Sequence, residues 1–397
     1  MRHIEGTEYP HGGELRIRRA DEWSAHRDRE FPTAVVTGAA GFIGSHLVDH
    51  LLLARHRVVG IDSFEPWYNP ARKASNLEAA CAHSSFRMEV KDLRSADLNA
   101  LLRGASTVYH LAAQPGVQHS WGVGLAKTME MNVSVTGAVL DAAAQVGVDR
   151  VVLASSSSVY GDSARTGGPN VVAPISPYGV SKVACEHLAD AYRQRGLDVV
   201  TLRYFTVFGP RQRPDMAMHK MFEATRRRGR PFTRRGSGEQ SREFTFVGDV
   251  AAATVMAGSV PEARGHTFDI GGGATVSLNE VIAEVSRIAG SPVQVRTVPM
   301  PAGEPWTTAA VVDEAGKVLG WRPRTTLRGA LRAQWDWHQT VRGPLTLGSL
   351  LSGASSSAGS LVRSRDLPSR NHATAAEAIK RNAHPQWSAT EPILSNA

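Results

Sequence analysis

Short apolar runs alternate with helical stretches through the first half of the chain. The runs lie at 34–36, 57–62, 86–90, 108–113, 150–154 and 199–204. Between them, apolar positions recur at helical spacing at 46–53, around 129–146 and at 178–195. Strands that alternate with helices predict a parallel sheet with helices on both faces, so the expected fold class is α/β.

The pattern changes after residue 205. Helices are expected at 215–228, 277–282, 313–319 and 327–339, with a hairpin at 236–250 and a strand at 268–270. This order predicts a smaller α/β unit over 206–342, beside the parallel sheet at 33–205. Residues 1–32 and 343–397 are polar, and we interpret them as an N-terminal extension and a disordered tail without a core of its own.

A glycine-rich turn joins the first strand to the first helix. Gly38 permits a tight turn, Gly41 lets the backbone approach a pyrophosphate, and Gly44 allows close packing of helix and strand. The helix N-terminus adds free N–H groups. Asp62 ends the second strand, where a carboxylate accepts the ribose hydroxyls of NAD and repels the 2′-phosphate of NADP. The sequence therefore predicts a Rossmann-type NAD site.

A second candidate site follows the fifth strand. The serine run 155–158 abuts this strand, and ligands bind at strand carboxyl ends in such sheets. Tyr178 and Lys182 are four residues apart, so they share one helix face. An ammonium beside a phenol favours the phenolate, which lets a tyrosine act as acid or base near neutral pH.

Composition narrows the possible partners. The net charge is +8, which suits an anionic partner. The basic run at 226–228 lacks interleaved aromatics, so we expect no nucleic-acid binding. No apolar run is long enough to span a bilayer, and no secretory leader is visible, so we expect no membrane association. Two cysteines cannot form a disulfide framework, which favours a cytoplasmic location. We expect no metal.

The spacing of Gly38, Gly41 and Gly44, with Phe42-Ile43 between the last two, resembles the extended short-chain dehydrogenase/reductase family of sugar-nucleotide epimerases and dehydratases. Two further segments, His110–Val117 and Pro210–Ala217, resemble UDP-glucuronate 4-epimerases in particular. Many relatives carry Asn at the position of Thr206. The resemblance covers about residues 33–342 and neither end.

The resemblance implies a role for each residue of the two sites. Ser156, Tyr178 and Lys182 would be catalytic. NAD would be held by Gly38, Gly41, Phe42, Ile43, Gly44, Asp62, Asp92, Leu93, Leu111, Ala112, Ala113, Asn132, Tyr178, Lys182 and Tyr204. A UDP-sugar would contact Gln114, Gly116, Ser156, Ser157, Ser158, Thr206, Arg213 and Arg242. Thr206 and Arg213 would recognise a sugar carboxylate, because an arginine fork matches that shape.

The function implied is NAD-dependent 4-epimerisation of UDP-glucuronate to UDP-galacturonate through a 4-keto intermediate. The main alternative is a UDP-glucose 4-epimerase. A dehydratase or decarboxylase is disfavoured, since Ser157 and Ser158 stand where such relatives carry an acid. A non-catalytic NAD-binding regulator need not keep the catalytic trio, and a dehydrogenase would release NADH. The family often forms homodimers through the helices around 129–146 and 178–195, so we expect a homodimer.

Overall fold

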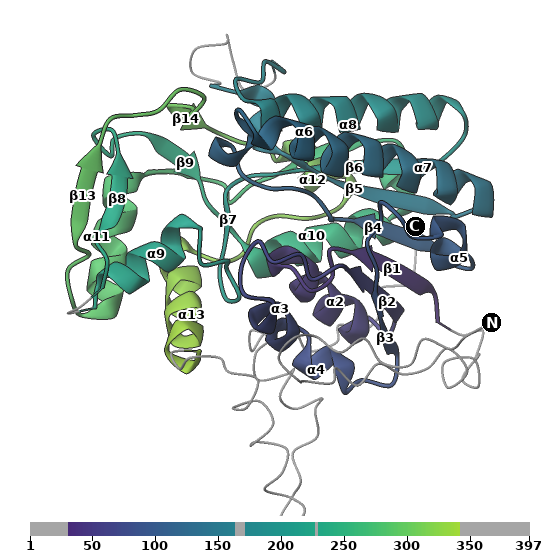
Figure 1. Ribbon diagram of the computed structural model, residues 1–397, viewed down its shortest axis with the longest axis horizontal. Coiled ribbons are helices and arrows are strands. Elements are labelled where there is room, and N and C mark those ends of the chain that lie inside the picture. Colours follow the sequence, from purple (N-terminus) through teal and green to yellow (C-terminus); the bar gives the residue numbers. More distant parts are fainter. Residues whose placement is uncertain (1–30, 163–170, 227–228, 342–397) are drawn as a thin grey trace, which may run out of the picture.

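The computed structural model describes residues 31–162, 171–226 and 229–341. Its central element is a seven-stranded sheet in the order β11-β6-β5-β4-β1-β2-β3 (Figure 1). All its neighbouring strands are parallel, which confirms the expected α/β class. The strands are β1 (Thr33–Thr37), β2 (Arg57–Asp62), β3 (Phe86–Val90), β4 (Thr107–His110), β5 (Arg150–Ser156), β6 (Val199–Tyr204) and β11 (Thr267–Ile270).

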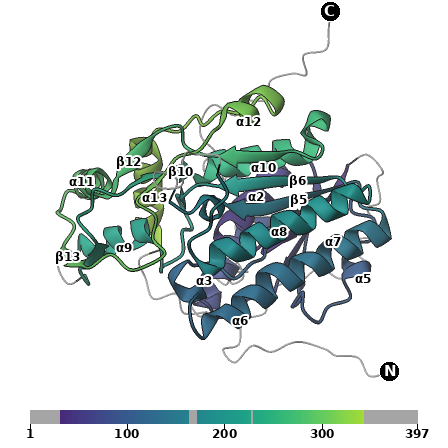
Figure 2. The same cartoon turned by 90° about the horizontal axis from the view of Figure 1, so that it is seen from above.

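Helices cover both faces of this sheet, because alternate strand residues point to opposite sides. Val36 and Val152 are buried with α2 and α10, while Val35 and Val151 are buried with α5, α7 and α8. Figure 2 shows α7 and α8 side by side, with α10 across the sheet. The helices are α2 (Phe42–Leu53), α3 (Pro70–Asn76), α4 (Glu78–Cys81), α5 (Leu98–Leu102), α6 (Gly124–Met129), α7 (Val135–Val146), α8 (Pro177–Gln194), α10 (Val247–Ser259) and α12 (Asp313–Val318).

A smaller group of elements lies beside the carboxyl ends of the strands (Figure 1). It buries its own apolar cluster, which includes Phe222, Val285 and Leu331. Its elements are α9 (Ala217–Ala224), β8 (Phe232–Arg235), α11 (Leu278–Ala289), β13 (Val295–Val298) and α13 (Leu327–Thr340). Short strands of two or three residues connect it to the large sheet, namely β7 (Val207–Phe208), β9 (Ser241–Glu243), β10 (Thr245–Phe246), β12 (Thr275–Ser277) and β14 (Thr307–Thr308).

Several element boundaries differ from the sequence-based expectation. The expected helix at 215–228 is shorter, because Met216 keeps an extended backbone and α9 starts at Ala217 and ends at Ala224. The expected helix at 129–146 begins earlier with α6 and passes through a π-helical turn, Glu130–Ser134, into α7. The helix expected at 277–282 is the start of α11, which opens with a capping box formed by Ser277 and Glu280.

The chain returns to the large sheet after its first excursion into the smaller group. α10 packs against α2, and β11 pairs with β6, although both follow residue 206. The extension expected at 1–32 and the tail expected at 343–397 lie almost wholly outside the described residues. Within the described part of the chain, no helix combines the length and apolar character needed to cross a bilayer.

Candidate active site

A cavity of about 470 Å³ opens at the carboxyl ends of the strands, next to the smaller group. Strand order reverses between β1 and β4, the place where open α/β sheets bind ligands. Nearly all the predicted site residues line this one cavity. These are Gly38, Gly41, Phe42, Ile43, Gly44, Asp62, Asp92, Leu93, Leu111, Ala112, Ala113, Gln114, Gly116, Ser156, Ser157, Ser158, Tyr178, Lys182, Tyr204, Thr206 and Arg213.

The glycine turn is shaped for close approach of a diphosphate. Gly38 has a φ of +70°, and a Cβ there would lie 2.9 Å from the backbone nitrogen of Ala112. A Cβ on Gly44 would lie 2.1 Å from the carbonyl oxygen of Gly38. Among the described residues, no side chain caps α2, so its first N–H groups are left for a ligand in the cavity. This cradle fits a dinucleotide.

Two acidic side chains lie on the far side of the glycine turn. Asp62 is buried, and its carboxylate accepts hydrogen bonds from the backbone N–H groups of Ala40 and Phe64. Lys73 forms an ion pair with it at 3.2 Å. Asp92 accepts three hydrogen bonds from the Arg94 side chain, which hold the pKa of this carboxyl below its ordinary value. Carboxylate oxygens at both positions can accept hydrogen bonds from the hydroxyl or amino groups of a ligand.

The expected catalytic trio comes from β5 and α8. Ser156 ends β5, and its Oγ accepts a hydrogen bond from the backbone of Ser158 at 3.2 Å. Lys182 is buried and donates to the carbonyl oxygen of Ala154 at 2.8 Å. Tyr178 lies one turn before Lys182, and its backbone N–H donates to Ser120 Oγ at 3.1 Å. All three residues line the cavity.

Asn132 does not line the cavity but connects two segments that do. It lies in the π-helical turn, where its side chain is almost fully buried. Its Oδ1 accepts from the backbone of Gln114 at 2.7 Å, and its Nδ2 donates to Ser181 Oγ at 2.9 Å. Because Ser181 precedes Lys182, Asn132 fixes the start of α8 relative to the segment after β4.

The segment after β6 supplies the polar groups nearest the smaller unit. Arg213 is mostly buried and makes a bidentate ion pair with Asp215, at 3.0 and 2.9 Å. Burial raises the pKa of Asp215, but the bonds from Arg213 outweigh it and hold that pKa below its usual value. The Asp215 carboxylate therefore orients the Arg213 guanidinium, and Arg213 and Thr206 both line the cavity. Tyr204, the last residue of β6, forms a hydrogen bond with Thr254.

Arg242 lies outside the cavity wall. Its guanidinium donates to the backbone carbonyls of Ser241, Pro305 and Trp306. A role in binding the pyrophosphate, expected from the resemblance, would therefore require this side chain to leave those carbonyls.

Sequence reasoning missed several residues that line the cavity. Trp67 and Tyr68 come from the segment between β2 and α3, Lys127 from α6, and Met216 from the start of α9. Lys127 pairs with Glu65, another lining residue, at 2.6 Å. The only signal in the sequence was an aromatic pair after Pro66 in a segment without periodicity.

Comparison with known proteins identifies the class that this fold and site define. Residues 34–271 match the NAD dependent epimerase/dehydratase family, and the chain belongs to that family.

Individual relatives are similar over most of their length. The chain is 38% identical to the uncharacterized UDP-glucose epimerase YtcB of Bacillus subtilis, over 75% of this chain and 95% of that protein. It is 35% identical to the UDP-glucose 4-epimerase of Mycolicibacterium smegmatis, over 74% of this chain and 94% of that protein. The crystal structure of the UDP-glucuronic acid 4-epimerase of Bacillus cereus with UDP-glucuronic acid and NAD superposes with a TM-score of 0.75 at 36% identity, covering 78% of this chain and 99% of that one.

Proposed function

We propose that this protein is an NAD-dependent 4-epimerase of a UDP-sugar, and that its substrate is UDP-glucuronate. The observation that carries the proposal is the composition of one cavity, which is lined by Ser156, Tyr178 and Lys182 and also by Thr206 and Arg213. The first three residues suit acid–base work at a sugar hydroxyl. The last two suit recognition of a carboxylate.

The cofactor would be held by the glycine turn, with Asp62 on the adenosine ribose. When bound, NAD supplies reversible hydride chemistry. Tyr178 takes the proton from the sugar 4-hydroxyl and later returns it, while Ser156 donates a hydrogen bond to the reacting oxygen. Lys182, which donates to the Ala154 carbonyl, would favour the phenolate form of Tyr178 from one turn along the same helix. Orientation by these side chains is the main contribution of the protein.

A neutral UDP-hexose is the second candidate substrate. The relatives in Bacillus subtilis and Mycolicibacterium smegmatis carry UDP-glucose epimerase names. The mostly buried guanidinium of Arg213 favours the hexuronate, because it is already fixed by Asp215 and partly removed from water. A charged hydrogen bond formed there is worth about 1.5 to 3 kcal/mol.

To test this proposal, the purified protein is incubated with UDP-glucuronate or with UDP-glucose, and the products are separated by chromatography and identified by NMR. We expect UDP-galacturonate from the first substrate, formed without net NADH. UDP-galactose from UDP-glucose alone would overturn the hexuronate proposal while keeping the 4-epimerase. A UDP-pentose with carbon dioxide, or net NADH, would overturn the epimerase itself.

Arg213→Gln separates the two substrates within one protein. Loss of the guanidinium should lower kcat/KM for UDP-glucuronate by about 10- to 100-fold, because the substrate carboxylate loses a charged partner. Any activity on UDP-glucose should change far less. Arg211→Gln is the matched control, since Arg211 pairs with Asp49 and does not line the cavity. Equal losses for both substrates in Arg213→Gln would contradict carboxylate recognition by this residue.

A further inference from the structure

Two histidines and a glutamate gather in the smaller unit, away from the cavity. His219 and Glu223 lie one turn apart on α9, and His338 lies near the end of α13. One ligand atom from each of the three lies within 4.8 Å of the others. The two helices lie next to each other in Figure 1, so the cluster bridges elements that are more than a hundred residues apart in sequence.

Burial of these histidines points to a ligand. His219 and His338 are 4% and 3% exposed, and Glu223 Oε1 lies 2.9 Å from His338 Nε2. In the described part of the chain, Nδ1 of His219 is buried and has no hydrogen-bond partner. A buried imidazole nitrogen without a partner costs about 1 to 3 kcal/mol. The ion pair between His338 and Glu223 gives those two side chains a partner, but it leaves Nδ1 of His219 without one.

We propose that His219, Glu223 and His338 form a binding site for a divalent transition metal, with Zn²⁺ as the representative ion. Two imidazoles and one carboxylate are a common ligand set for zinc. Ligand bonds of about 2.0 to 2.2 Å place tetrahedral donor atoms roughly 3.4 Å apart, so side-chain rotations bring the three groups onto one ion. The Glu223 side chain is 39% exposed, which gives solvent access and leaves the fourth position to water. This proposal departs from the sequence-based expectation of no metal, which could not foresee ligands that come from two helices far apart in the chain.

The electrostatics of His219 agree with this assignment. Burial, and after it the neighbouring His338, lower the pKa of His219 to about 4. The imidazole is therefore uncharged at neutral pH, and the uncharged ring is the form that binds metals.

A metal at this position would act on the loop that borders the cavity. The backbone N–H of His219 donates to Gln212 Oε1 at 3.0 Å, and Gln334 of α13 donates to the same oxygen at 2.7 Å. Gln334 also accepts from the backbone of Gly209 at 3.1 Å. An ion that holds α9 against α13 would stabilise residues 209–216, which include Arg213.

The test measures metal binding by the full-length protein without any substrate, so its result is independent of the proposed epimerase activity. Chelator-treated protein is titrated with Zn²⁺ in a calorimeter, and metal content is measured after dialysis. We expect one equivalent more in the wild type than in Glu223→Gln or His338→Gln, in which the affinity of this site should fall at least about 10-fold. His266→Gln is the matched control, because His266 faces Glu314 in an exposed pair elsewhere.

The melting temperature and the Co²⁺ absorption spectrum test the same metal site independently of the calorimetric titration. Excess Zn²⁺ should raise the melting temperature of the wild type and of His266→Gln by about 2 to 5 °C, and that of Glu223→Gln by much less. Co²⁺ should give the visible absorption of a tetrahedral site only where Glu223 and His338 are intact. Glu223 is partly exposed, so its amide variant should fold. No binding by the wild type, or equal binding by all variants, would overturn the proposal.

Discussion

His110 ends β4 and is enclosed between two threonine hydroxyls. Its Nδ1 lies 2.8 Å from Thr37 Oγ1, and its Nε2 lies 3.1 Å from Thr136 Oγ1. Burial, and after it the charge of Lys182, lower the pKa of His110 to about 3. The ring therefore stays uncharged in the folded protein through the whole range in which a free histidine gains a proton.

This depressed pKa predicts a loss of stability in mild acid. Above pH 6.5 the ring is neutral in both states, but below it the unfolded chain binds a proton that the folded protein does not. Unfolding free energy should therefore fall by about 1.4 kcal/mol per pH unit from this residue. Denaturant melts measure the unfolding free energy at pH 6.5 and at pH 5. The drop in unfolding free energy between these two pH values should be about 2 kcal/mol larger for the wild type than for His110→Gln. Parallel profiles would contradict the assignment.

Residues of the site differ in how far their sequence context predicts them. Gly38 follows a buried strand, and Asp62 and Ser156 end two others. The carboxyl ends of parallel strands lie at one edge of the sheet, so strand order brings these three residues together. Trp67 reaches the cavity from an irregular segment, where no periodicity constrains direction. Arg242 has the expected place in sequence, but side-chain direction depends on which carbonyls compete for its guanidinium, and that is a tertiary property.

At the scale of elements, the π-helical turn Glu130–Ser134 between α6 and α7 could not be predicted from hydrophobic periodicity. The helices on either side have an ordinary period, and one extra residue in the turn shifts the phase between them. This shift accompanies the buried position of Asn132, whose amide bonds both Gln114 and Ser181. The existence of a helix here could be predicted, whereas its interruption depends on contacts with α8.

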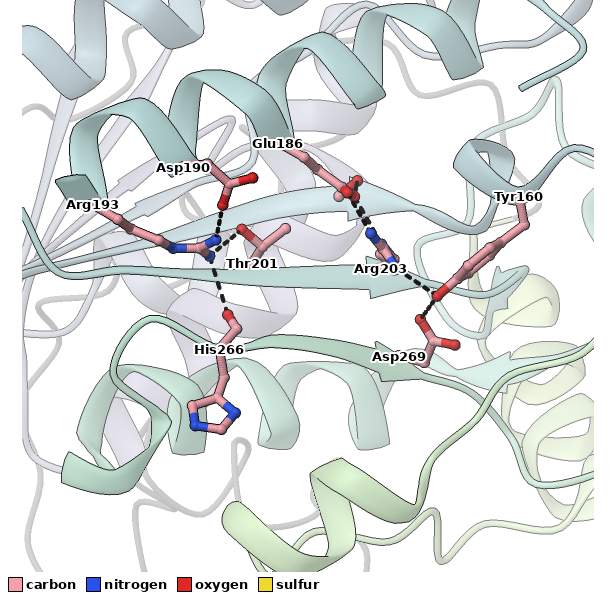
Figure 3. Close-up of polar contacts among 9 residues, drawn as sticks. Tyr160, Glu186, Asp190, Arg193, Thr201, Arg203, His266 and Asp269 are labelled. Atoms are coloured by element: carbon pink, nitrogen blue, oxygen red, sulfur yellow. Dashed lines mark hydrogen bonds and ion pairs between the residues drawn. The ribbon is translucent and has the colours of Figure 1, made fainter. Parts of the chain in front are cut away.

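A buried polar network ties α8, β6 and β11 together behind the site (Figure 3). Arg203 of β6 makes a bidentate pair with Glu186 of α8, at 3.0 and 2.6 Å, and donates to the Tyr160 hydroxyl at 2.6 Å. Tyr160 donates in turn to Asp269 of β11 at 2.7 Å. Glu186 also accepts from Ser155, the neighbour of Ser156, so the network fixes the end of β5.

Arg203→Met should destabilise the protein, because it leaves Glu186 as a buried charge without its partner. Breaking such a pair costs about 3 to 5 kcal/mol, and the Arg203 and Glu186 side chains are only 17% and 11% exposed. Arg328→Met removes an arginine of 70% exposure that pairs with Glu284 and should cost less than about 1 kcal/mol. Denaturant melts of the two variants make the comparison. A similar small loss in both would show that the network contributes little to stability.

At the scale of the whole molecule, the cavity is lined by residues at the strand ends of the large sheet and by Val207, Arg213 and Met216, which lead into the smaller unit. The chain crosses between the sheet and the smaller unit more than once (Figure 1). α10 covers the sheet and β11 joins its edge, although β7, α9, β8, β9 and β10 precede them in the chain and lie outside the sheet. The two parts are therefore bound to each other by several segments, which favours a fixed geometry for a ligand held between them. A cytoplasmic location, expected from the sequence, stays a prediction.

The expected homodimer would form through the outer surface of α7 and α8, which lie side by side on one face of the sheet (Figure 2). Ala138 and Ala191 are exposed there, and small exposed residues on adjacent helices allow a second pair of helices to pack closely. Light scattering at micromolar concentration should give the mass of two chains for the wild type. Ala138→Glu with Ala191→Glu should shift it toward one chain, because four like charges would face each other across the two-fold axis. Ser259→Glu, on α10 across the sheet, should leave the dimer intact. A wild-type monomer under these conditions would contradict the dimer.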